Sequence, residues 1–229
     1  MEYLARMVLE HQGINELLQV QRELLERLKK AKGVNIVHLN NSLAFWRDFL
    51  EQEHMSWEEE FAFAAFRKFN HSLPDRLQGE HERIRTALAQ LEATLKQLKS
   101  GRPRSGREYV KWGEELVETV ADHIARENAV LRELAVDGPA TEAVLDLPEG
   151  PRRERINHLV QIAEELCREY LQKGTALYPL CKKTGAVVGQ TPPPATAGDG
   201  DETAREGELG EAAGSAGDEQ GGEFIVNGG

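Results

Sequence analysis

Six side chains that can bind a metal ion recur in two matched sets along the sequence. In each set a histidine is followed, 42 or 43 residues later, by a second histidine, and a glutamate comes four positions after that. The first set is His11, His54 and Glu58, and the second is His81, His123 and Glu127. Imidazole nitrogens and carboxylate oxygens are ligands of transition metals, so the two sets together predict a metal site.

The segments that carry these residues are expected to be long helices, because apolar residues recur in them three and four positions apart. Gly33, Pro74, the stretch "SGRPRSG" and the stretch "DGPA" separate the segments. The expected helices cover residues 2–31, 36–69, 75–99 and 107–134, with Asn35 as the N-cap of the second. Four such helices joined by short breaks predict an all-α fold, an antiparallel up-down four-helix bundle.

The six polar residues fall on the apolar stripes of these helices and at one height along the bundle. With a rise of 1.5 Å per residue, His11 and His54 lie about 30 and 27 Å from the turn between their helices. His81 and His123 lie about 27 and 24 Å from theirs. The same periodicity places Val8 and Phe61 on the buried stripes. The six side chains are therefore expected to converge in the core.

A core metal site is favoured over a metal-free polar core. A single inward histidine is most often a satisfied core residue, but a buried carboxylate costs several kcal/mol unless a cation compensates it. Two carboxylates at one level cannot both stay ionised without such a cation. In the run of glutamates at 58–60, Glu59 and Glu60 are expected to be ordinary solvated charges.

The donor set favours iron or manganese over zinc and magnesium. Imidazole with shared carboxylate in a four-helix core is typical of di-iron and di-manganese proteins. Zinc favours thiolates or a tetrahedral set, and magnesium favours oxygen ligands alone. Two histidines per metal with shared carboxylates would leave coordination positions open to a small molecule.

The rest of the chain predicts one more helix and a tail. Residues 151–173 read as an additional C-terminal helix, on which Tyr170 aligns with His123, although a phenol is a rare iron ligand. Residues 191–229 hold nine acidic residues and one basic residue, so the tail carries −8 of the net charge of −11. Its Gly, Ala and acidic composition predicts disorder. The expected domains are a bundle at 1–136, an additional helical segment at 150–184 and a disordered acidic tail at 185–229.

Composition argues against several other classes of protein. No basic face suggests nucleic-acid binding, no window is apolar enough for a membrane span, and the N-terminus does not read as a signal peptide. Cys167 and Cys181 fit no metal or redox spacing and are expected to be ordinary thiols. The remaining histidines, at 38, 71 and 158, fall off the common level. We expect a cytoplasmic protein whose acidic tail could contact a protein partner. The closing "EFIVNGG" is expected to be an unstructured end, with a short docking motif as the alternative.

The ligand pattern resembles the hemerythrin-like (HHE cation-binding) family over about residues 4–134. Oxygen-carrying members have a histidine on the first helix, His-x-x-x-Glu on the second, His-x-x-x-His on the third and His-x-x-x-x-Asp on the fourth. This chain has Arg85 four positions after His81 and Asn128 five positions after His123. Its set of four histidines and two glutamates is similar to the subgroup of iron-centre repair proteins and the iron-sensing hemerythrin domain.

The resemblance implies two non-haem iron ions bridged by Glu58 and Glu127, with two histidines on each. It implies binding or sensing of O2, nitric oxide or peroxide; the alternatives are iron handling, iron sensing and iron–sulfur centre repair. Two other classes are a histidine phosphotransfer bundle, which needs one exposed histidine, and a metal-free helical interaction scaffold. No residue is assigned a catalytic role, so whether the protein is an enzyme stays open.

Overall fold

The computed structural model describes residues 2–136 and 149–177, and every regular element in these two ranges is helical. The all-α class is therefore confirmed. The elements are α1 (Glu2–Lys29), α2 (Ile36–Ala44), η1 (Phe45–Met55), η2 (Glu58–Ala62), α3 (Phe63–Phe69), α4 (Leu73–Lys99), α5 (Ser105–Val136) and α6 (Gly150–Leu171), where η marks a π-helix.

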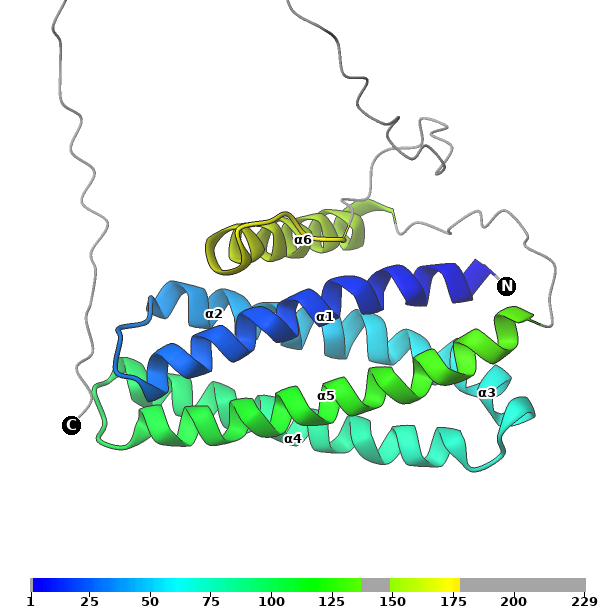
Figure 1. Cartoon of the computed structure of the whole chain (residues 1–229), viewed down its shortest axis with the longest axis horizontal. Coiled ribbons are helices and arrows are strands. Elements are labelled where there is room, and N and C mark those ends of the chain that lie inside the picture. The colour runs from blue at the N-terminus through cyan, green and yellow to red at the C-terminus, as the bar shows by residue number, and fades with distance from the viewer. Residues whose placement is uncertain (1, 137–148, 178–229) are drawn as a thin grey trace, which may run out of the picture. The chain divides into compact units, whose positions relative to one another are not determined.

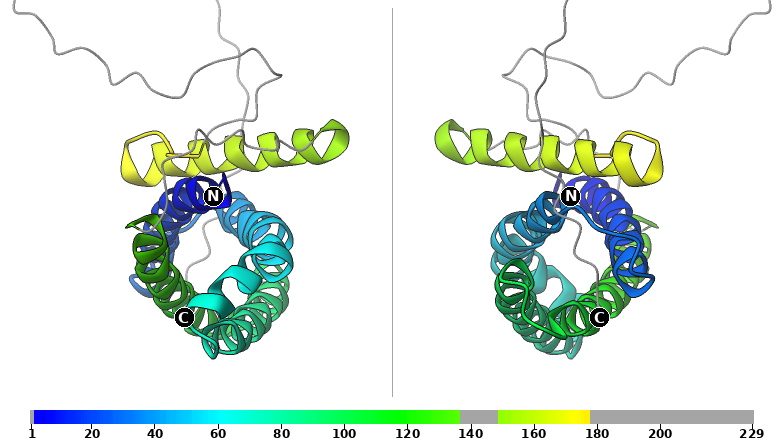
Figure 2. Two further views of the ribbon diagram at one scale, coloured as in Figure 1. Left: turned by 90° about the vertical axis from the view of Figure 1, so that its right-hand side faces the viewer. Right: turned by 90° about the vertical axis from the view of Figure 1, so that its left-hand side faces the viewer.

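Helical rods lie side by side around one interior, and α6 lies outside them (Figure 1). The rods are α1, the continuous run from α2 through the π segments to α3, and then α4 and α5. Viewed along their length they form a ring, and α6 crosses the outside of α1 and α2 (Figure 2). Buried leucine, isoleucine, valine and aromatic side chains from all of the rods fill the interior.

Local chemistry sets the helix ends close to the predicted positions. The Asn35 side chain accepts a hydrogen bond of 2.8 Å from the amide of Val37 and caps α2. Gly33 and Gly101 adopt φ values of +71° and +69° in the two turns at one end of the bundle. A residue without a Cβ adopts this left-handed conformation at little cost, which explains glycine at both positions.

The second rod differs from the single α-helix expected over residues 36–69, because residues 45–55 and 58–62 are π-helical. A π segment bonds each amide one residue further back than an α-helix does, so it shifts which residues face the core. Phe61, which was expected inside, is 53% exposed, whereas Ala62 and Phe66 are fully buried. The expectation for Phe61 was wrong for this reason.

Val8 was also wrongly expected inside and is 41% exposed. The inward residues of α1 around it are Met7, His11 and Ile14, all at most 2% exposed. Val8 follows Met7 directly, so it projects to the side of this line of residues, about 100° further around the helix.

Helix α6 is attached to the bundle at both of its ends. Near its start, Arg152 and Arg155 bind the two oxygens of the buried Glu53 carboxylate on η1, at 2.7 and 2.8 Å. Near its end, the Tyr170 hydroxyl lies 2.7 Å from His38 Nδ1 on α2. Tyr170 is therefore a packing residue of α6 and does not contact the six predicted ligands.

The segment after α6 continues along α1. The Glu16 carboxylate accepts hydrogen bonds from Thr175 Oγ1 and the Ala176 amide. The Leu177 side chain lies where a Cβ on Gly13 would be, so this contact requires glycine in α1.

Several predictions fall outside the described residues. These are the disordered tail at 185–229 with its closing "EFIVNGG", the segment from 178 onward that includes Cys181, and the break at "DGPA". Cys167 is described and is a buried free thiol. Among the helices that the structure describes, none is both long enough and apolar enough to cross a membrane.

We expect the double substitution Arg152→Ala and Arg155→Ala to loosen α6. Glu53 would then be a buried carboxylate without a cation, which costs about 2 kcal/mol or more. Hydrogen exchange should quicken at α6 amides such as those of Leu159 and Val160, by about thirtyfold for that loss. Arg153→Ala, which removes a neighbouring arginine that makes no ion pair with Glu53, is the control. Equal exchange rates of the α6 amides in the double variant and in Arg153→Ala would show that the ion pairs with Glu53 do not hold α6 on the bundle.

Candidate metal centre

The six predicted residues meet in the interior of the bundle. His11 comes from α1, His54 from η1, and Glu58 is the first residue of η2. His81 comes from α4, and α5 contributes both His123 and Glu127. All six are at most 2% exposed. Each rod thus supplies at least one ionisable side chain to a single buried cluster, as the helical periodicity predicts.

Glu58 lies between two pairs of histidines. Its Oε1 is 2.7 Å from His54 Nε2 and 3.8 Å from His11 Nε2. Its Oε2 is 3.2 Å from His81 Nε2 and 3.5 Å from His123 Nε2. Each oxygen of this one carboxylate therefore faces a different pair.

Glu127 joins the same two pairs from the opposite rod. Its Oε2 is 3.2 Å from His11 Nε2 and 3.4 Å from His123 Nε2. Two groups of ligand atoms, each within 4.8 Å of one another, result: His11, His54, Glu58 and Glu127 form one, and Glu58, His81 and His123 the other. Glu58 belongs to both groups. The cluster offers two adjoining positions for cations.

The outer nitrogens of the first histidine pair are bound by oxygen acceptors. His11 Nδ1 is 2.8 Å from Asn128 Oδ1, and His54 Nδ1 is 2.7 Å from Glu10 Oε2. An oxygen acceptor at Nδ1 keeps a ring proton there, so Nε2 is the nitrogen that faces inward and can exchange its proton for a metal. A metal requires the tautomer with its proton on Nδ1.

The second pair is held in the same way. His81 Nδ1 is 2.7 Å from Glu59 Oε1, and His123 Nδ1 is 3.2 Å from Glu80 Oε2. Arg85 donates a hydrogen bond of 2.6 Å to Glu59. Arg85, which stands where oxygen-carrying relatives have a histidine, therefore acts from outside the cluster by binding the residue that orients His81.

Glu59 was expected to be a solvated charge, and this was wrong. It is half-buried, and its two partners are the ring of His81 and the guanidinium of Arg85. Glu60 is exposed, as expected. The two neighbours differ because the π segment turns Glu59 toward α4.

Sequence reasoning missed all four residues that hold the histidines, although a signal was present. Each of them directly precedes or follows one of the six clustered residues in the chain. They are Glu10 before His11, Glu59 after Glu58, Glu80 before His81 and Asn128 after Glu127. A polar residue next to an inward residue on a helix lies about 100° around the axis, where it reaches the ring of a neighbouring rod.

The charges in the cluster compensate one another. Burial lowers the pKa of His54, but the carboxylates of Glu58 and Glu10 outweigh this and raise it well above its usual range. Burial raises the pKa of Glu58, but His54 and the other rings outweigh this and hold it well below its usual range. For His123, burial is likewise outweighed by Glu127, Glu58 and Glu80, which raise its pKa to about 10. The lowered pKa of Glu58 keeps this carboxylate ionised, so that it attracts a positive charge.

Several buried atoms of the cluster lack a hydrogen-bond partner, and these are the atoms that a metal would bind. Although these nitrogen and oxygen atoms lie close to one another, the angles between them are not those of hydrogen bonds. The atoms are Nε2 of His11 and His54, and both carboxylate oxygens of Glu58 and of Glu127. An unsatisfied buried polar atom costs about 1–3 kcal/mol. Cations between the Nε2 atoms and the carboxylates would remove this cost, so the donor set fits a metal centre.

Comparison with known families agrees with this geometry. A family model described as the hemerythrin HHE cation binding domain matches residues 3–135, which is more than half of the chain. No curated protein and no solved structure matches the chain.

We expect a divalent metal to stabilise the protein strongly, since it would satisfy the unpaired atoms. At a free Fe2+ concentration 1,000 times the dissociation constant, the free energy of unfolding should rise by about 4 kcal/mol. Anaerobic thermal unfolding with and without Fe2+ measures this gain. Glu58→Ala should abolish the gain, whereas the exposed Glu60→Ala should preserve it. An equal gain in both variants would place the metal elsewhere.

Proposed function

Because the chain belongs to the hemerythrin HHE cation-binding family, we propose that it holds a non-haem di-iron centre that binds or senses O2, nitric oxide or peroxide. The observation that carries this proposal is the position of Glu58, whose two oxygens face two separate histidine pairs. One carboxylate shared by two adjoining cation positions is the arrangement that a dinuclear centre needs.

In this proposal His11 and His54 would hold one iron, and His81 and His123 would hold the other. Glu58 and Glu127 would be shared by the two. The ligands are imidazole and carboxylate without thiolate, which favours iron or manganese over a structural zinc site. When bound, two irons supply open positions and accessible oxidation states for a small diatomic molecule or oxidant.

The chain itself holds the ligands and limits access of water. Met7 and Ile124 are at most 1% exposed, and the ring of Phe63 stacks on that of His81 with centroids 5.4 Å apart. Such a layer favours a small, weakly polar molecule such as O2 or nitric oxide over larger polar ones. The oxygen acceptors at each Nδ1 keep the rings oriented.

The organisation expected from the sequence is part of the proposal. The metal-binding domain is residues 1–136, an antiparallel up-down four-helix bundle in which α2, η1, η2 and α3 together form the second member. Residues 150–184 add a helical segment on its outside, and a cytoplasmic location fits the proposed iron chemistry.

A second candidate function is iron handling, iron sensing or iron–sulfur centre repair. The observation in its favour is Arg85, whose guanidinium binds Glu59 and approaches Glu51 rather than entering the cluster. The donor set is thus limited to four histidines and two glutamates, which would hold iron less firmly than a fuller set.

The first experiment counts metals and records spectra. Protein purified anaerobically should contain about two irons per chain, and its absorption spectrum should change on exposure to O2 or nitric oxide. Glu58→Ala should lose most of the iron, and Glu60→Ala should keep it. Fewer than about one iron per chain, with zinc or no metal in its place, would refute the di-iron centre.

The same preparation separates the two candidates. For a binding or sensing role, the spectral change should reverse when O2 or nitric oxide is removed, with the iron content constant in the presence of a chelator. For iron handling, the chelator should remove the iron on the timescale of the assay. Iron lost this readily would favour the second candidate over the first.

We expect Glu59→Gln to weaken metal binding without removing a ligand. The neutral amide would hold the His81 ring less firmly and make it less basic, and losing such a partner typically costs 10–100-fold in metal affinity. Competition with a calibrated chelator measures the change. Glu60→Gln, which alters the adjacent exposed glutamate in the same way, should leave the affinity unchanged. Equal affinities in the two variants would deny Glu59 this role.

A further inference from the structure

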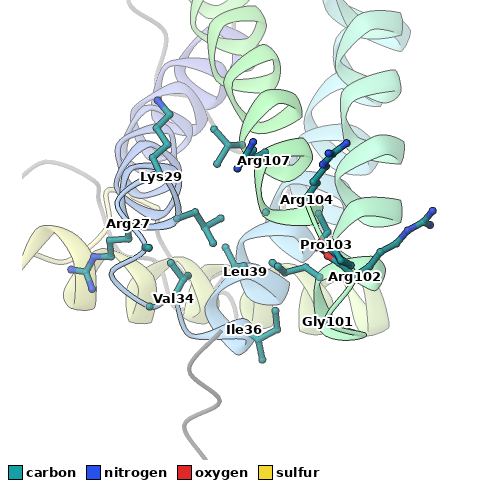
Figure 3. A pocket seen from close by; sticks show the side chains of 17 residues that line it. Arg27, Lys29, Val34, Ile36, Leu39, Gly101, Arg102, Pro103, Arg104 and Arg107 are labelled. Atoms are coloured by element: carbon teal, nitrogen blue, oxygen red, sulfur yellow. Dashed lines mark hydrogen bonds between the residues drawn. The ribbon is translucent and has the colours of Figure 1, made fainter. Parts of the chain in front are cut away.

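A pocket lies at the end of the bundle where the α1–α2 and α4–α5 turns meet. Its volume is about 620 Å³, within the range of pockets that bind ligands. Its floor is apolar and includes Val34, Ile36 and Leu39, which project between the turns (Figure 3). The metal cluster uses none of the residues that line this pocket.

The lining of the pocket is strongly positive. Five of its seventeen residues are arginine or lysine, and none is acidic. The five are Arg27, Lys29, Arg102, Arg104 and Arg107. This composition is unusual in a chain whose net charge is −11. The pocket therefore favours a negatively charged occupant with an apolar part.

The cations of α1 already have partners. Arg27 binds Glu23 and lies over the ring of Tyr170, and Lys29 binds Glu26 and Glu114.

The arginines of the α4–α5 turn differ from them. Arg102, Arg104 and Arg107 are exposed, and none makes an ion pair within the part of the chain that the structure describes. In Figure 3 they stand around the rim of the pocket on the side of the turn. These three side chains are available to an anionic occupant.

The chain contains a segment with the matching chemistry. Residues 191–229, which lie beyond the described residues, hold nine acidic residues and one basic residue. Near their end stand Asp218, Glu219 and Glu223, followed by the apolar run Phe224, Ile225 and Val226. The chemistry of this run would fit an apolar floor bordered by cations.

The connecting chain is long enough to reach. Leu177 is anchored against Gly13 on α1, and the pocket begins at Arg27 and Leu28 of the same helix. The distance from Gly13 to Leu28 along the helix is about 22 Å. Phe224 follows Leu177 by 47 residues in the sequence, and a random coil of that length has a root-mean-square length of about 38 Å. Docking within one chain is therefore geometrically easy and needs little affinity, because the segment is tethered.

We propose that residues 218–226 dock into this pocket of their own chain. Phe224, Ile225 and Val226 cover the apolar floor, and the acidic residues before them pair with Arg102, Arg104 and Arg107. The proposal stands apart from the metal centre, because no ligand and none of the residues that orient the ligands line the pocket.

Photo-crosslinking in the full chain tests whether residues 218–226 dock into the pocket. Phe224 is replaced by a benzophenone amino acid, the protein is irradiated at low concentration, and the crosslinked peptides are mapped. Crosslinks should fall within residues 27–39 and 98–110. Arg102→Gln, Arg104→Asn and Arg107→Gln together should lower their yield at least fivefold; asparagine is used at 104 because that residue has φ +69°. Salt at 0.5 M should also lower the yield.

A charge-matched control separates docking from general attraction. Arg22→Gln, Lys68→Gln and Arg153→Gln together remove three positive charges outside the pocket and should leave the yield unchanged. Ile225→Asn with Val226→Asn should lower the yield as the arginine substitutions do. Hydrogen exchange of the bundle confirms that each variant is folded.

Three outcomes would overturn the proposal. The first is crosslinks spread over the bundle or absent from the pocket. The second is crosslinks between isotopically labelled and unlabelled chains, which would make a second copy the occupant. The third has two parts: crosslinking stays unchanged in the triple arginine variant, and a free anionic amphiphile such as oleate still protects the pocket amides from hydrogen exchange. This result would separate anion binding in the pocket from docking of the tail.

Discussion

Two carboxylates buried at one level of an apolar core are the constraint on which this structure depends. Glu58 and Glu127 are fully buried, and neither has a hydrogen-bond partner for its oxygens. Without compensation each costs several kcal/mol. The four histidines around them supply that compensation as protonated rings or as ligands of bound cations. Every rod of the bundle therefore contributes a side chain to the same place.

The polar residues one step outside this cluster give it a fixed geometry. Four oxygen acceptors bind the four outer ring nitrogens, and three of those acceptors are glutamates. All three glutamates are themselves bound by arginines: Glu10 by Arg6, Glu59 by Arg85, and Glu80 by Arg126. Charge alternates outward from carboxylate to imidazole to carboxylate to guanidinium. Such alternation lets several charges remain in a poorly solvated region, since each has an opposite neighbour.

The helices and the six inward residues follow from sequence periodicity, because a repeat of three and four residues fixes one face of a regular helix. The predictions failed where the helix is not regular. In the second rod, π winding turns Phe61 outward and Ala62 and Phe66 inward, and it directs Glu59 toward His81. The spacing of apolar residues in the sequence does not show where a helix changes from α to π hydrogen bonding. The partners of the histidines also escaped prediction, because they depend on the spacing between rods rather than on one helix.

Helix α6 has a further consequence for how molecules diffuse to the interior. It crosses the seam between α1 and α2 (Figure 2), and its start is fixed beside His54 through Glu53. A small molecule that approached the interior through that seam would have to pass a third layer of side chains, whereas the described part of the chain places no such layer over the seams that α6 leaves uncovered. α6 therefore shields one side of the cluster while it supplies none of the six clustered side chains.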